Sequence, residues 1–415
     1  MFDIELEITK HLQDLASFSA TDPETEGVTR LPFTREAEKA AAYLKQYMEE
    51  AGLQVRIDGT GAVIGRLEGE RKETILTGSH YDSVTRGGKY DGTAGIVCGV
   101  TAVKLLRERG CRPEYSIEVI ATNDEEGFRF SRGFLTSTAM CGGYTAGDLM
   151  HITEVGTGKP LAEIMKEQGF LPEMVEAEKG TAGRYKSFIE VHVEQGPVLE
   201  SEGMSLGIVT GIAGIHRYFF QVTGVANHAG STPMDHRVDA LYIASRIVQY
   251  IYEETSSWQG VVATVGHMEL TPNAMNVIPG EAKFTLDMRS ADEQKMLKLY
   301  DKIRKFAEEA AGQAGAGLTI TPGTRADAVF MDQKLQMSLE HVIQEEGFAY
   351  RYVESGAGHD SQVFAGFVPT AMLFVPSIGG ISHNKKEYTE SSDLARAARV
   401  LAGVLARETG EEKAK

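Results

Sequence analysis

The sequence has little cysteine and no obvious targeting segment. Its three cysteines, Cys98, Cys111 and Cys141, fit neither a disulfide framework nor a zinc ribbon in number or spacing. Free thiols in a reducing compartment are the simplest interpretation, so we expect a cytoplasmic protein. The N-terminal residues MFDIELEITK contain no basic region followed by a long apolar run, and no secretory signal peptide is predicted.

Long hydrophobic runs and an excess of basic residues are also absent. No stretch reaches about 18 apolar residues, the length that a membrane-spanning helix needs. The 42 Lys and Arg residues are outnumbered by 59 Asp and Glu residues, which gives a formal net charge of −17. Nucleic acids and anionic membranes are bound by clustered basic residues, so we expect neither as a partner. A small anionic substrate is compatible with this charge, because local charge decides its binding.

The 415 residues, of which 42% are hydrophobic and 24% charged, are typical of a globular protein with about two domains. Strand and helix patterns alternate along the N-terminal half. Examples are a helix over 34–52, a strand-like run at 74–78, a helix over about 92–110 and a strand over 115–122. This alternation predicts an α/β fold, in which a mostly parallel sheet carries helices on both faces.

The pattern changes in the middle of the chain. From about 207 to 324 we expect strand, helix, strand, strand, helix and strand, the order of a ferredoxin-like α+β unit. The α/β pattern returns from about residue 330. The sequence therefore predicts one domain from residues 1–209 and 329–415, and a second, inserted domain from residues 210–328.

Polar residues gather where predicted strands end, which is where ligand sites lie in sheets of this kind. His80 and Asp82 follow the run at 74–78, and Asp91 lies in the glycine-rich loop after them. Imidazole and carboxylate groups suit zinc, manganese, cobalt or nickel. In extended chain Asp82 can reach the other ring nitrogen of His80 and fix its tautomer. A lone His-x-Asp is more often structural, so this motif needs support from the rest of the chain.

Glu125 and Glu126 form a second cluster directly after the strand at 115–122. Adjacent carboxylates repel each other unless a cation or a raised pKa relieves them. A solvated turn is the ordinary interpretation of such a pair. The functional interpretation is that one carboxylate binds a metal ion while the other accepts a proton from metal-activated water.

His192, on a predicted strand over 187–194, and His383, after the apolar run at 371–375, complete the set. Each alone would more often be an ordinary histidine. Together, these candidates all lie at or just past predicted strands of the α/β part. Two metal ions that share one bridging carboxylate would need about this number of ligands.

Eight segments occur in the order of a known family: GSHYDS at 78–83, GGKYDG at 87–92, EEGFRF at 125–130, EVHVEQGPVLE at 190–200, NHAGSTPM at 227–234, PNAMNVIP at 272–279, GAGHD at 356–360 and GGISH at 379–383. On these segments the chain resembles the hydantoinase/carbamoylase family of dinuclear metal amidohydrolases, within the aminoacylase-like metallopeptidase group. The resemblance extends over nearly the whole chain.

The resemblance implies roles for residues of the first domain. Two divalent ions (Zn, Mn, Co or Ni) would be bound by five ligands, with Asp91 bridging them: His80, Asp91, Glu126, His192 and His383. Glu125 would be the general base and Asp82 would orient His80. Gln195 and Gly358 would line the substrate pocket.

The inserted domain would then be a lid and dimerisation domain. His228, Asn276 and Arg289 match substrate-binding positions of the family. Arg289 would hold the α-carboxylate, for which its planar fork is suited. His228 would polarise the scissile carbonyl from the partner subunit of a homodimer.

The implied reaction is hydrolysis of an N-carbamoyl-L-amino acid to the amino acid, carbon dioxide and ammonia. Allantoate and N-carbamoyl-β-alanine are alternative ureido substrates that these residues cannot separate. An aminoacylase or dipeptidase is less favoured, because the Glu-Gln-Gly-Pro motif after His192 differs from the peptidases. A non-catalytic metal-binding protein would have lost the base or a ligand, yet Glu125 and all five ligands are present. Thr122, Asn123 and Asp124 depart from the family pattern before the glutamate pair and leave the exact substrate open.

Overall fold

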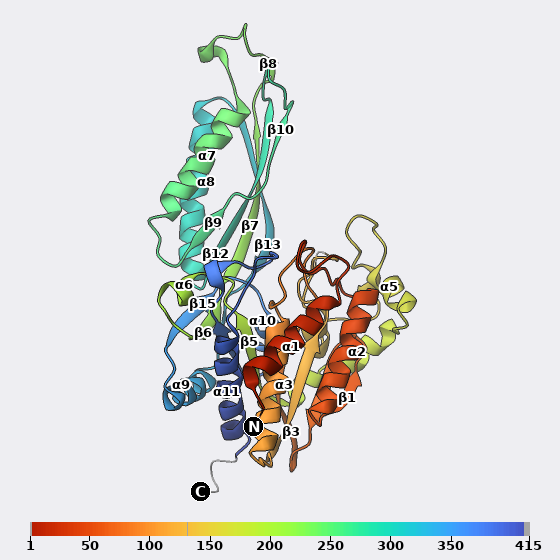
Figure 1. The fold of residues 1–415 in the computed structure, drawn as a ribbon. Coiled ribbons are helices and arrows are strands. Elements are labelled where there is room, and N and C mark those ends of the chain that lie inside the picture. The colour runs from red at the N-terminus through yellow and green to blue at the C-terminus, as the bar shows by residue number, and fades with distance from the viewer. Residues whose placement is uncertain (1, 131, 411–415) are drawn as a thin grey trace. The chain divides into compact units, whose positions relative to one another are not determined.

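A computed structural model describes residues 2–130 and 132–410 of the chain. The chain forms two compact units, divided between Thr210 and Gly211 and again between Val329 and Phe330 (Figure 1). The second unit is therefore an insertion in the first. Each unit has its own hydrophobic core.

The first unit is built on a nine-stranded sheet with the order β1-β2-β4-β3-β5-β16-β6-β14, and β15 also pairs with β6. Its four central strands, β4, β3, β5 and β16, run parallel to one another. The pairs β1–β2, β2–β4 and β16–β6 are antiparallel. The α/β prediction is confirmed, with the parallel part at the centre of the sheet. The strands are β1 (Gln54–Ile57), β2 (Val63–Leu67), β3 (Arg71–His80), β4 (Tyr115–Thr122), β5 (Tyr185–Val193), β6 (Leu206–Ile212), β14 (Val329–Phe330), β15 (Tyr350–Ser355) and β16 (Thr370–Val375).

Alternate residues of the central strands enter different cores, as the period of two in a strand requires. In β4, Val119 belongs to the large core on one face and Ile120 to a smaller core on the other. Five helices contribute to the large core: α1 (Ile4–Ser17), α2 (Arg35–Glu50), α3 (Thr93–Glu108), α9 (Gln333–Glu346) and α11 (Ser391–Glu408). The short helices α4 (Leu135–Met140) and α10 (Asp360–Phe364) contribute to the smaller core.

A small lobe follows the glutamate pair and has a third core, which includes Phe130, Leu161 and Val175. Its regular elements are α5 (Leu161–Glu167) and the 3₁₀ turns η1 (Asp148–Met150), η2 (Pro172–Glu178) and η3 (Thr181–Arg184). The short helix α6 (Val198–Ser201) follows β5.

In its main sheet the second unit has the order strand, helix, three strands, helix and strand, one strand more between the helices than expected. An antiparallel sheet, β10-β12-β7-β13 with β9 on β12, is covered on one face by α7 and α8. The elements are β7 (Gly214–Thr223), α7 (Ala240–Thr255), β9 (Val262–Thr264), β10 (Met268–Thr271), β12 (Glu281–Ser290), α8 (Glu293–Gln313) and β13 (Gly317–Ala326). A separate two-stranded ribbon joins β8 (Asn227–His228) to β11 (Val277–Ile278), and the turn η4 (Met234–His236) lies between β8 and α7.

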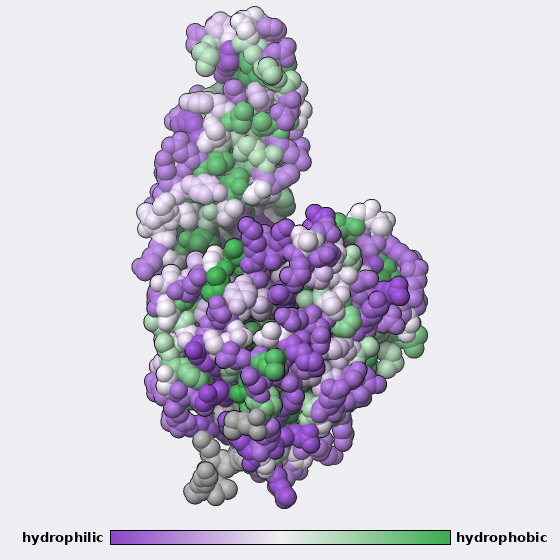
Figure 2. Space-filling model, in the orientation of Figure 1, coloured by the Kyte–Doolittle hydropathy of each residue, from purple (hydrophilic) through white to green (hydrophobic). Residues whose placement is uncertain are grey.

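Local sequence sets the helix starts in both units. The side chain of Asp239 accepts hydrogen bonds from the N–H groups of Leu241 and Tyr242 at the start of α7, and Asp332 caps α9 in the same way. Such caps satisfy amide groups that have no partner inside the helix. Among the described residues no helix combines the length and apolar character needed to cross a membrane. The face seen in Figure 2 is mainly hydrophilic, with hydrophobic residues scattered across it.

Candidate active site

The five predicted metal ligands meet at the carboxyl edge of the parallel strands. His80 is the last residue of β3, His192 lies near the end of β5, and Glu126 follows β4. Asp91 precedes α3, and His383 follows β16 after the turn η5 (Ile378–Gly380). Parallel neighbours end at the same edge of a sheet, which explains why residues so far apart in sequence come together.

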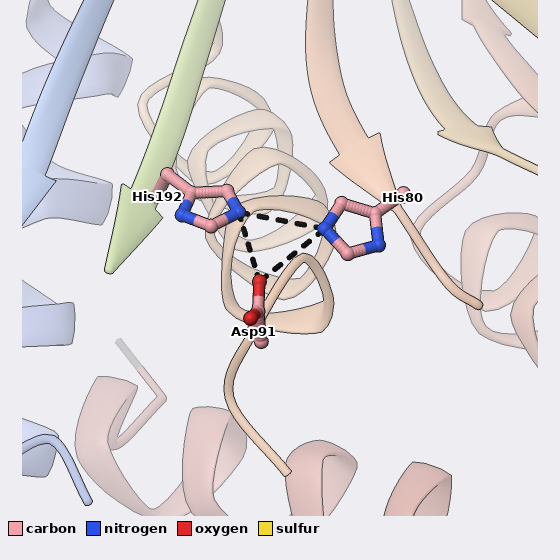
Figure 3. A group of neighbouring side chains, drawn as sticks. All are labelled: His80, Asp91 and His192. Atoms are coloured by element: carbon pink, nitrogen blue, oxygen red, sulfur yellow. Dashed lines mark hydrogen bonds and ion pairs between the residues drawn. The ribbon is translucent and has the colours of Figure 1, made fainter. Parts of the chain in front are cut away.

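His80, His192 and Asp91 form the first group of possible ligands (Figure 3). The Nε2 atoms of His80 and His192 lie 3.4 Å and 3.2 Å from Asp91 Oδ1, and 3.5 Å from each other. Ligand atoms about 2.0–2.1 Å from a tetrahedral ion would be about 3.3 Å apart. The three residues therefore fit a first-row divalent cation.

Asp91, Glu126 and His383 form the second group. His383 Nε2 lies 3.2 Å from Asp91 Oδ2 and 3.3 Å from Glu126 Oε2. Asp91 directs Oδ1 toward the first group and Oδ2 toward the second, so it is shared by both. Two groups joined by one carboxylate have the arrangement expected of a dinuclear site.

Hydrogen bonds fix which ring nitrogen of each buried histidine faces this site. Nδ1 of His80 lies 3.1 Å from the Asp82 carbonyl oxygen, and Nδ1 of His192 lies 2.9 Å from the Val193 carbonyl oxygen. A proton on Nδ1 leaves the Nε2 lone pair for a metal ion.

The carboxylate of Asp82 has a different main contact from the one expected. It lies 3.7 Å from His80 Nδ1, and it accepts hydrogen bonds from the N–H groups of Glu125 and Glu126 at 3.1 Å and 3.3 Å. The side chain thus holds the glutamate pair, while the main-chain carbonyl of the same residue contacts the histidine ring.

Glu125 is buried beside the first group, with Oε2 3.9 Å from His80 Nε2. Burial raises the pKa of Glu125 well above its usual range, and nearby carboxylates such as Glu126 raise it further, against the lowering effect of His80. A carboxylate with a raised pKa can take up a proton near neutral pH, as a general base must.

Two ligand candidates of the second group have pKa values that are raised to neutral pH or above. Burial, followed by repulsion from Asp91, raises the pKa of Glu126 to about 7. The hydrogen bond to Asp91 raises the pKa of His383 to about 9. A cation entering this group must therefore displace protons at neutral pH.

We expect metal binding to release protons and to tighten as the pH rises. His383 is mainly protonated below its pKa of about 9, and Glu126 below its pKa of about 7, so the binding-competent forms increase with pH. Each proton released at a given pH strengthens binding about tenfold per pH unit. Calorimetric titration with zinc in buffers of different protonation enthalpy measures the protons released. Binding that releases no protons at pH 7 would contradict this expectation.

Of the two predicted pocket residues of the first unit, Gln195 contacts the shared ligand Asp91. Gln195 donates from Nε2 to Asp91 Oδ2 at 2.9 Å, and its buried Oε1 has no hydrogen-bond partner within the described chain. Gly358 lies against Phe134, because a Cβ atom at this glycine would be 3.0 Å from the phenyl ring.

His228 and Asn276 are neighbours in the second unit. The N–H of Ala229 donates to the Asn276 carbonyl oxygen at 3.0 Å, and Val277 pairs with His228 in the ribbon. The His228 ring is exposed, and Nδ1 accepts from the N–H groups of Gly230 and Ser231 at 3.1 Å each. Nε2 therefore carries the proton and can donate it to a ligand.

Arg289 lies at the end of the five-stranded sheet that is farther from this ribbon. It pairs with Ile215 at the start of β7, whereas Glu281, near the ribbon, pairs with Thr223 at the end of β7. Eight residues of strand span about 26 Å at about 3.3 Å per residue. The unit therefore does not bring Arg289 and His228 together. Nε of Arg289 lies 2.9 Å from Asp287 Oδ1.

Sequence reasoning did not identify Glu387 and Ser382, which also contact the Asp91 segment. In the sequence, nothing distinguishes the two residues from the other polar residues around His383. Only their contacts with Asp91 in the folded chain do so. His359, in the GAGHD segment, also lies beside the first group. Its ring packs edge-on against His192 with centroids 4.4 Å apart.

Comparisons with known proteins show the family to which the chain belongs. Residues 68–407 match the model of Peptidase family M20/M25/M40. The chain is 37% identical over 401 residues to N-carbamoyl-L-amino-acid amidohydrolase of Paenarthrobacter aurescens, covering 96% of each chain. It is also 37% identical over 402 residues to allantoate amidohydrolase of Escherichia coli K12, again covering 96% of each. A crystal structure of a hydantoinase/carbamoylase family amidase from Burkholderia multivorans has a TM-score of 0.90 at 31% identity, covering 98% of both chains. The chain therefore belongs to Peptidase family M20/M25/M40 and, within it, to the hydantoinase/carbamoylase amidohydrolases.

Proposed function

We propose that this amidohydrolase cleaves the carbamoyl C–N bond of N-carbamoyl-L-amino acids, with two divalent ions (Zn, Mn, Co or Ni) bound at the site. The observation that carries the proposal is the pair of ligand groups that share Asp91, with the buried carboxyl of Glu125 beside them. The relative from Paenarthrobacter aurescens, named for this substrate class, supports the choice of substrate. We propose the cytoplasm as its compartment, since Cys98, Cys111 and Cys141 are free thiols.

When bound, the two ions would act as Lewis acids and lower the pKa of the attacking water. Glu125 then accepts a proton from that water as its oxygen attacks the ureido carbonyl carbon. The same carboxyl returns the proton to the leaving nitrogen as the C–N bond breaks. The carbamic acid released loses carbon dioxide, so one water and one substrate give amino acid, carbon dioxide and ammonia. Gln195 keeps Asp91 in place by a hydrogen bond to its Oδ2, and the Ser382 hydroxyl lies 3.1 Å from the same oxygen.

Residues of the second unit would recognise the substrate. We propose that Arg289 binds the α-carboxylate and that His228, with Asn276, stabilises the developing oxyanion from the partner subunit. The distance along the sheet supports this division, because one small substrate cannot reach both ends of one unit. A homodimer, with this unit as lid and dimerisation domain, would supply Arg289 from one chain and His228 from the other.

Allantoate is the second candidate substrate, because the allantoate amidohydrolase of Escherichia coli is equally similar, at 37% identity. The proposal is tested by ammonia release from N-carbamoyl-L-methionine, N-carbamoyl-β-alanine and allantoate with manganese-loaded protein. We expect the highest kcat/KM with the carbamoyl amino acid. The Glu125→Gln variant serves as the control for contaminating activity. A higher kcat/KM with allantoate would show that allantoate, and not a carbamoyl amino acid, is the substrate. If the metal-loaded protein releases no ammonia from any of the three compounds, ureido hydrolysis is refuted.

A further inference from the structure

Glu387 is a buried carboxylate, 3% exposed, in the loop between η5 and α11. Its Oε1 accepts hydrogen bonds from the N–H groups of Tyr90 and Asp91, each at 2.9 Å. Its Oε2 accepts from the Ser382 hydroxyl at 2.7 Å. One side chain therefore joins the loop that carries Asp91 to the loop that carries His383.

The Asp91 loop approaches this carboxylate too closely for a side chain. A Cβ atom at Gly88 would lie 2.1 Å from Glu387 Oε1 and 2.2 Å from its carboxyl carbon. The backbone conformation of Gly88 does not itself require glycine, so the close approach is the reason for it. This contact gives a structural role to the second glycine of the Gly87–Gly88 pair.

Ser382 provides a second connection to the shared ligand. Its hydroxyl lies 3.1 Å from Asp91 Oδ2, the oxygen that faces His383, as well as 2.7 Å from Glu387 Oε2. Glu387 thus contacts Asp91 directly through the backbone N–H, and the Ser382 hydroxyl, whose single hydrogen can go to either carboxylate, lies between the two side chains. Hydrogen bonds to carboxylates are among the stronger ones in proteins, and such partners orient metal ligands.

We infer that Glu387 is a positioning residue that holds Asp91 with one oxygen toward each ligand group and keeps the His383 loop against it. The inference rests on the proposed two-metal site. The two groups should not depend on Glu387 equally. His80 and His192 are buried on strands, whereas the His383 side chain is 49% exposed on the loop that Glu387 fastens. Loss of Glu387 should therefore weaken the ion bound by Asp91, Glu126 and His383 first.

The test is a zinc titration of the full-length protein by competition with a chromophoric chelator. We expect wild type to bind two ions. Glu387→Ala should bind one ion like wild type and the other about 10- to 100-fold more weakly, the usual effect of removing a partner that orients a ligand. Glu387→Gln should recover part of this loss, because its amide oxygen can still accept from the two N–H groups.

Glu118→Ala is the matched control for losing a buried carboxylate. Glu118 is also 3% exposed and is bonded to Arg66 at 2.9 Å and Tyr185 at 2.6 Å, on β4 away from the proposed ligands. It should lower Tm and leave both zinc affinities unchanged. If Glu387→Ala does not fold, Gly88→Ala displaces the same carboxylate and should likewise weaken one ion.

The outcomes separate the two ideas. Two ions bound by the Glu387 and Gly88 variants as tightly as by wild type, with only Tm lowered, would overturn the positioning role and leave the proposed function standing. Fewer than two ions bound by wild type would refute the dinuclear site itself, and the inference with it.

Discussion

Replacing Glu125 with Gln is expected to lower kcat about 10²- to 10⁴-fold, because a general acid–base group contributes about that much. The amide keeps the size of the side chain but cannot accept and return the proton. Glu125 belongs to neither ligand group, so zinc stoichiometry should be unchanged. KM should change little, because the amide has the size of the carboxyl group and the proposed substrate-binding residues are unchanged. The measurement is steady-state ammonia release with N-carbamoyl-L-methionine at saturating metal.

Glu194→Gln is a suitable control for this experiment. Glu194 lies two residues after His192, and its carboxylate accepts hydrogen bonds from the N–H groups of Val198 and Leu199, not from the proposed site. It should retain near wild-type kcat. A Glu125→Gln variant with wild-type kcat would show that another group moves the proton.

The second large effect concerns the proposed dimer. His228→Ala alone should lower kcat about 10²- to 10³-fold, as loss of an oxyanion donor does. Arg289→Ala alone should mainly raise KM, because it removes the partner of the substrate carboxylate. A mixed dimer of one His228→Ala chain and one Arg289→Ala chain should recover about half of the wild-type activity, because a twofold interface leaves one complete site.

The reciprocal mixed dimer makes the result decisive. A wild-type chain paired with a His228→Ala/Arg289→Ala chain has the same two substitutions, but both sites lack one residue if His228 acts across the interface. At substrate concentrations well below the wild-type KM, where loss of either residue lowers the rate, it should be nearly inactive. If both residues serve their own subunit, the result reverses, and this dimer has one intact site while the first has none. Two affinity tags on separate chains allow each mixed dimer to be purified before assay.

The sequence determined much of the fold, because the buried apolar positions of a helix or strand recur in the sequence with the period of that element. In β4 the apolar residues on both faces identify a strand covered by helices, and the alternation with α3 predicts parallel neighbours. The edge strands could not be predicted in the same way. The antiparallel pairs β1–β2 and β16–β6 depend on contacts between segments far apart in the chain, for which periodicity gives no signal.

The candidate site, like the fold, could be predicted from the sequence only in part. The sequence supplied the ligand candidates, since residues at strand ends of a parallel sheet share one edge, and the roles of these residues stay predictions until they are tested. Asp82 lies beside His80, as expected, with its carboxylate 3.7 Å from Nδ1. The sequence did not show that the same carboxylate accepts from the backbone of Glu125 and Glu126, which only the turn after β4 brings near.

By itself, the sequence determined the chemistry that is available, since imidazole and carboxylate side chains at particular positions limit the reactions the chain can perform. Tertiary structure decided the distances. It made Asp91 a member of both ligand groups and brought Glu387, nearly three hundred residues away in sequence, against its backbone. It also put Arg289 at the end of the five-stranded sheet that is farther from the ribbon of His228. The physical reason is that residue type fixes what a group can bind, while metal coordination and hydrogen bonding depend on separations of a few tenths of an ångström that only the folded chain sets.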